Sequence, residues 1–80
     1  MIQYTYATEI DEIQDGDYTI TTKNSLYCLN AEGPNSFLGN FKNLEDLLIF
    51  LEDNMYKTRR YPNIFIINDH GNVDQLVKIK

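Results

Sequence analysis

The sequence predicts an α+β fold of two layers, in which one main helix packs on a small antiparallel sheet in the order β-hairpin, helix, β-hairpin. Three observations predict this class. Residues 17–23 and 26–29 are strand-like segments separated by a polar link. Residues 44–55 repeat leucine at helical spacing, and residues 64–67 and 73–80 are strand-like segments on either side of a polar turn. A chain of 80 residues has room for one domain, which spans its whole length.

The first hairpin is indicated by alternation with a period of two. In the segment DYTITTK, Tyr18, Ile20 and Thr22 share one side of a strand. β-branched and aromatic residues fit such a pleated surface. The polar link of residues 23–25 is short enough for a tight turn, and its asparagine tolerates positive φ. We therefore expect residues 26–29 to form the second strand.

An additional strand is expected near the N-terminus, because residues 2–7 also alternate. Residues 8–13 are expected to form a short helical turn with Thr8 as its cap. Gly16 is the natural end of that turn.

The central helix has clear boundaries and one apolar face. Asn43 is a suitable N-cap, Glu45 and Asp46 place negative charge in the first turn, and Pro62 stops the helix. A single stripe of apolar residues recurs at helical spacing. Its members are Leu44, Leu47, Leu48, Leu51 and Met55.

The polar segment at residues 68–72 contains the only histidine of the chain. A polar cluster with a glycine between two strands is typical of a hairpin loop of three to five residues. Gly71 supplies positive φ, and Asn68 and Asp69 can satisfy local backbone groups. The favoured interpretation is a turn.

The alternative is a catalytic His70 that acts as a general base, oriented by Asp69 or Asp74. Asp69 is poorly placed for this role, because adjacent strand residues point to opposite faces. No serine or cysteine nucleophile stands near in sequence, although the fold could bring Ser25 or Cys28 close. We assign no catalytic residue and expect a protein that is not an enzyme.

The sequence also argues against metal and cofactor sites. Asn68, Asp69, Asn72 and Asp74 are oxygen donors, but an EF-hand loop needs a carboxylate at its twelfth position and helical flanks. One cysteine and one histidine cannot form a structural zinc site, and a lone cysteine cannot form an internal disulfide. The glycines match no phosphate-binding motif. Cys28, between apolar neighbours, is interpreted as a core residue.

The net charge of −5 bears on partners and location. An acidic surface repels nucleic acid, so no direct nucleic-acid partner is expected. The apolar runs are too short for a membrane span, and the first residues do not resemble a signal peptide. A free cysteine without a targeting segment favours the cytoplasm.

Two charged clusters are candidate sites. The acidic one, residues 9–17, could hold a divalent ion weakly, but a solvated surface turn is favoured. The basic cluster, YKTRRYP, places Lys57, Arg59 and Arg60 between tyrosines and could bind phosphate or stacked bases. Cations at the end of a helix are equally expected from the helix dipole, and this interpretation is favoured.

The most informative feature is a surplus of apolar side chains. Ile49 and Phe50 lie outside the helical stripe, and the strand at residues 64–67 is apolar on both sides. A two-layer sandwich covers only one face of its sheet, which would leave a face of this strand open. We therefore predict a homodimer. Its expected interface residues are Ile49, Phe50, Phe65, Ile67 and Tyr56.

The segments DYTITTKNSLYCLN, NLEDLLIFLEDNMY and NIFIIN resemble the YopT-like family of small hypothetical proteins from Bacillus prophage. The resemblance covers most of the chain and rests on length and layout. It implies a homodimer with one helix and about three strands per subunit, no assigned activity and no functional residues to transfer.

Three functions remain as hypotheses. The first is a cytoplasmic, non-catalytic homodimeric interaction module that also binds a host or phage protein. The second is an acidic inhibitor that occupies the nucleic-acid-binding groove of a host or phage enzyme, with binding that weakens steeply with salt. The third is a small enzyme that uses His70.

Overall fold

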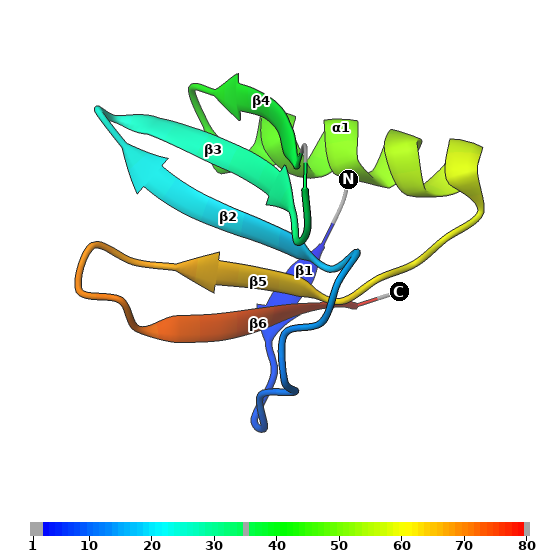
Figure 1. Cartoon of the computed structure of the whole chain (residues 1–80), viewed down its shortest axis with the longest axis horizontal. Helices are drawn as coiled ribbons and strands as arrows, with labels where there is room; N and C mark the ends of the chain where they lie inside the picture. Colours follow the sequence, from blue (N-terminus) through cyan, green and yellow to red (C-terminus); the bar gives the residue numbers. More distant parts are fainter. Residues whose placement is uncertain (1–2, 35, 80) are drawn as a thin grey trace.

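The fold is one helix packed on a six-stranded sheet (Figure 1). A computed structural model describes residues 3–34 and 36–79. Ile2 and Lys80, which belong to two of the predicted strands, lie outside the described residues. The elements, in chain order, are β1 (Tyr4–Tyr6), β2 (Tyr18–Lys23), β3 (Leu26–Ala31), β4 (Phe37–Phe41), α1 (Leu44–Thr58), β5 (Ile64–Ile67) and β6 (Val73–Lys78).

The predicted two-layer α+β class is confirmed, but the sheet is mixed and not antiparallel. Its strand order is β1-β6-β5-β2-β3-β4. The hairpins β2–β3 and β5–β6 are both present and are joined by a parallel pairing of β2 with β5. The connection through β4 and α1 carries the chain back to the end of the sheet where β2 begins, so that β5 runs parallel to β2 on the side opposite β3. The resemblance to the YopT-like family implies about three strands, whereas the described residues form six.

The helix forms where its capping residues predict. Oδ1 of Asn43 accepts a hydrogen bond from the backbone N–H of Asp46 at 2.9 Å. The first turn carries two acidic residues and the last turn carries Lys57, which complements the helix dipole. The helix ends at Thr58, and Arg59 follows in a left-handed conformation with φ of 58°.

The core lies between α1 and the helix-facing side of the sheet. Four residues of the predicted stripe are buried, namely Leu47, Leu48, Leu51 and Met55. They pack against buried residues of four strands, namely Tyr18 and Ile20 of β2, Leu29 of β3, Ile64 of β5 and Leu76 of β6. The helix therefore covers one face of the sheet, as the fold class requires.

Both predicted turns are present. Asn24 and Ser25 have φ of 51° and 63° and join paired Lys23 and Leu26, which is the tight turn that right-twisted hairpins favour. In the second hairpin, Oδ1 of Asn68 accepts hydrogen bonds from the backbone N–H groups of His70 and Asn72 at 2.9 and 3.0 Å. The turn interpretation of this segment is therefore supported by its own hydrogen bonds.

The segment between β1 and β2 is irregular, so the predicted helical turn at residues 8–13 is wrong. It lies on the side of the molecule away from α1 (Figure 1). Its hydrogen bonds do not follow a helical pattern, and several go to residues far away in the sequence. Asp11 bonds to Gln75 and Asn63, and Asp17 accepts hydrogen bonds from Asn63 and Gln14. These contacts tie the segment to the sheet.

The edge strand β4 is not among the strands that the sequence predicts. It pairs with β3 from Tyr27↔Phe41 to Asn30↔Phe37, with a bulge beside Leu29 and Asn30. Phe41 packs on Phe50 with ring centroids 5.3 Å apart. This aromatic pair joins β4 to α1.

Candidate functional site

The five predicted interface residues do not share one surface. Phe65 is completely buried within the single chain, so its assignment to an interface is corrected. Ile67 is half-buried on the sheet face opposite α1. Ile49, Phe50 and Tyr56 are exposed on the helix, but Phe50 lies on a different side of it from Ile49 and Tyr56.

Phe65 is buried because the second sheet face is covered along one row of residues. In the strand register it lies between Thr19 of β2 and Gln75 of β6. All three are buried on the face opposite Ile64, which belongs to the helix-side core. Since Gln75 bonds to Asp11, we attribute this burial to the segment at residues 7–16. The prediction failed because it left one sheet face entirely open.

The next row on that face is only half-covered. It runs through Val73, Ile67, Thr21, Cys28 and Asn40, one residue from each of five strands. Cys28 is intermediate in burial, and Nδ2 of Asn30 contacts its sulfur at 3.5 Å. It is therefore not part of the helix-side core, contrary to its interpretation as a core residue.

The edge of β4 and the adjacent side of α1 form the first candidate surface, which we call the β4 flank and define as β4 together with Phe50. Phe37 is 59% exposed, and its register partner Asn30 places it on the sheet face opposite α1. Phe50 is 39% exposed and packs on half-buried Phe41 on the helix side. The strand FLGNF has no charged residue and no proline, two devices that usually protect an edge strand. Its bulge is the one protective feature it has.

Ile49 and Tyr56 lie away from the β4 flank. At 100° per residue, Ile49 is 100° from Phe50 around the helix axis, and Tyr56 is 120° from Phe50 on the same side as Ile49. Tyr56 is 73% exposed. The two residues can serve as controls for a surface that contains Phe50.

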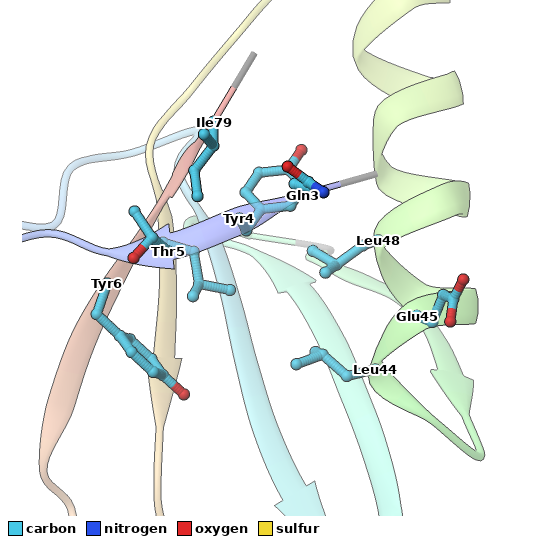
Figure 2. Close-up of a pocket in the computed structure, with 9 residues that line it drawn as sticks. Gln3, Tyr4, Thr5, Tyr6, Leu44, Glu45, Leu48 and Ile79 are labelled. Carbon is cyan, nitrogen blue, oxygen red and sulfur yellow. The ribbon is translucent and has the colours of Figure 1, made fainter. Parts of the chain in front are cut away.

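A groove of about 640 Å³ between β1 and the first half of α1 forms the second candidate surface (Figure 2). We call it the β1–α1 groove. Leu44 and Leu48 point from α1 toward β1, and Tyr6 lies across from Leu44 (Figure 2). Leu76 and Ile79 add apolar surface. Among the described residues that line the groove, Glu45 carries the only charge.

One end of the groove is closed by a polar bridge between the helix and the sheet. Tyr4 donates its hydroxyl proton to Oε2 of Glu52 at 3.1 Å, and Nζ of Lys78 binds Oε1 of Glu52 at 3.0 Å. Burial, the hydrogen bond to Glu52 and the charge of Glu52 all raise the pKa of Tyr4 well above 10.0. Tyr4 therefore remains a neutral donor across the physiological range.

The remaining candidate sites give less support. The backbone of His70 participates in the turn, but no bond from its ring to Asp69 or Asp74 is present among the described residues. In the acidic cluster, Asp11 and Asp17 are engaged in internal hydrogen bonds. Within residues 3–34 and 36–79, no three histidine, cysteine or acidic side chains are arranged to hold a metal ion. None of the described helices is long and apolar enough to cross a bilayer.

Comparisons with known proteins add no assignment, because no family model, no curated protein and no solved structure matches this chain. The resemblance to YopT-like proteins therefore stays a prediction.

Proposed function

We propose that this chain is a small, non-catalytic interaction protein that works as a homodimer joined through the β4 flank. The observation that carries the proposal is the uncharged edge strand β4, which has the Phe41–Phe50 pair on its helix side and exposed Phe37 at its other end. A two-fold axis would place the same patch of each copy against itself, which is the usual geometry of soluble dimers.

In this dimer the β4 strands of the two copies would pair with each other in antiparallel orientation. We expect continuous pairing across Gly39 to Phe41, because the bulge shifts Phe37 out of line. Asn40 at the centre would meet Asn40 of the second copy. The two sheets would then form one continuous sheet, with both helices on the same face.

The expected affinity is moderate. Burying a phenylalanine is worth about 1.5–3 kcal/mol, and roughly half of each exposed ring is already covered. Four rings, Phe37 and Phe50 from each copy, would then contribute about 3–6 kcal/mol. This burial free energy is comparable with the lower estimates of the entropic cost of association. Backbone hydrogen bonds between the two strands, at about 0.5–1.5 kcal/mol each, therefore determine whether the dimer is stable. A Kd near 1 µM corresponds to about −8.2 kcal/mol and is the order we expect.

A charge on the β4 flank tests the interface. Phe50→Glu should convert the dimer to a monomer in sedimentation equilibrium, because it places two carboxylates against an apolar seam. Ile49→Glu introduces the same charge on the next residue, away from the seam, and should leave the dimer intact. Equal loss of dimer in both variants, or in neither, would contradict this interface.

The same proposal places the chain in the cytoplasm with a host or phage protein as a further partner, and the free thiol of Cys28 is consistent with a reducing compartment. The acidic-inhibitor alternative has less support. Asp11 and Asp17 are engaged within the fold, and Asp53 and Glu52 bind Lys57 and Lys78. Fewer carboxylates are then free to imitate nucleic acid.

A further inference from the structure

We infer that the β1–α1 groove binds an extended peptide segment of a partner protein, one that carries large apolar side chains at alternate positions and a lysine or arginine at one end. The inference does not rest on the homodimer, because the groove lies at the opposite sheet edge from β4. Three properties of the groove support this occupant.

The first property is its size and apolar lining. Sites for ligands and peptide side chains are concave and mostly apolar, with a volume of about 300–1,000 Å³. The groove has about 640 Å³, and aliphatic side chains from α1, from β6 and from Ile79 enter it or line it. Tyr6 and Ile79 remain exposed at its rim. Two large apolar side chains of a ligand would shield the exposed surface of these two residues from water.

The second property is the free edge of β1. The N–H of Ile79 donates to the carbonyl of Gln3, and the N–H of Ala7 donates to the carbonyl of Gln75, so residues 3 and 7 direct their backbone groups toward β6. In an antiparallel pair the alternate residues point the other way. The N–H and C=O groups of Tyr4 and Tyr6 therefore face the edge, where they are available to an added strand.

The third property is charge. Glu45 is exposed at the groove, and both oxygens of Glu52 are already engaged by Tyr4 and Lys78. A cation on the ligand would pair with Glu45. A second copy of this chain is a poorer occupant: Lys42 follows its other free edge strand, β4, but Gly39 interrupts the alternation of large apolar side chains along that strand.

The experiment uses the full chain labelled with ¹⁵N and three acetylated peptide amides as probes. They are Ser-Leu-Ser-Leu-Ser-Lys, Ser-Leu-Ser-Leu-Ser-Glu and Ser-Ser-Ser-Ser-Ser-Lys, and each is also made in reverse order. We expect the peptide with leucines and lysine to bind best, with roughly a threefold to tenfold preference over its glutamate counterpart that salt reduces. Its binding should slow amide exchange at Tyr4 and Tyr6 by about tenfold.

Matched variants locate the site. Tyr6→Ser and Glu45→Lys should each weaken binding of the leucine–lysine peptide at least about threefold. Tyr56→Ser and Glu12→Lys make the same changes at exposed positions outside the groove and should leave binding unchanged. All four positions are exposed, so each variant is expected to fold.

Four results would overturn the inference. One is that no probe binds at millimolar concentration. Another is binding that shifts the resonances of Leu44 and Leu48 without protecting the Tyr4 and Tyr6 amides, as a small apolar ligand would. A third is protection of these amides by protein concentration alone, which would identify a second copy as the occupant. The last is equal loss of binding in the groove variants and in their controls.

Discussion

Asp11 and Gln75, which are 64 residues apart in the chain, bind each other through two hydrogen bonds. The backbone N–H of Asp11 donates to Oε1 of Gln75 at 2.9 Å, and Nε2 of Gln75 donates to Oδ2 of Asp11 at 3.2 Å. This pair holds the segment at residues 7–16 against the second face of the sheet, beside buried Phe65. A domain of this size thereby covers part of both sheet faces with one helix and one irregular segment.

Loss of the Gln75 side chain should detach this segment. Gln75→Ala removes both hydrogen bonds to Asp11, each worth about 0.5–1.5 kcal/mol, and should destabilise the fold by about 1–3 kcal/mol. Urea unfolding measures the free energy, and amide exchange should accelerate mainly within residues 7–16. Gln14→Ala removes an exposed amide side chain from the same segment and should change neither quantity. Unchanged exchange in Gln75→Ala would show that the pair does not hold the segment.

Truncation of Phe65 should be among the most damaging single changes. The side chain is fully buried, so Phe65→Ala should lower the free energy of unfolding by about 3–5 kcal/mol. Tyr56→Ala removes a similar ring from an exposed position and should stay within about 0.5 kcal/mol of the parent. Thermal or urea unfolding of both variants makes the comparison. A mild effect at Phe65 would mean that the second sheet face is not covered as described.

The raised pKa of Tyr4 predicts a loss of stability in alkali. The unfolded chain releases the phenolic proton near 10.0, whereas the folded chain retains it to higher pH. The contribution of Tyr4 is therefore complete below pH 10 and is lost progressively as pH rises above that value. In urea unfolding at pH 8, 10 and 11, Tyr4→Phe should lose less stability over this range than the parent does. Parallel curves for the two proteins would argue against this linkage.

Removal of the helix cap should have a moderate effect. Asn43→Ala deletes the acceptor for the Asp46 N–H and should cost about 1 kcal/mol. Lys42→Ala changes the preceding exposed residue and is the control, with an expected effect within about 0.5 kcal/mol. The midpoint of urea unfolding distinguishes the two.

Local signals predicted well those elements that local interactions determine. Asn43 and the leucine spacing located α1, and Asn24 and Gly71 located two turns that need positive φ. The parallel contact of β2 with β5 was missed because it joins segments far apart in sequence. Strand β4 was missed because its glycine and asparagine suggested a loop.

The candidate surfaces were only partly predictable. Phe50 could be identified because it lies off the helical stripe. Phe65 was wrongly assigned to an interface. We attribute its burial to residues 7–16, which the pair Asp11–Gln75 holds in place, and no short sequence motif predicts this long-range pair. The β1–α1 groove was not foreseen. The alternation of Tyr4 and Tyr6 predicts the strand β1. The groove, however, depends on how far β1 lies from α1, and the order of all the strands in the sheet determines that distance.

The molar mass in solution tests the central claim most directly. Sedimentation equilibrium of the unmodified chain should approach twice 9.4 kDa as its concentration rises above roughly 10 µM, tenfold above a Kd of about 1 µM, and should fall toward 9.4 kDa on dilution. A mass that remains at 9.4 kDa at every concentration up to about 1 mM would contradict a homodimer and the proposed role of the β4 flank.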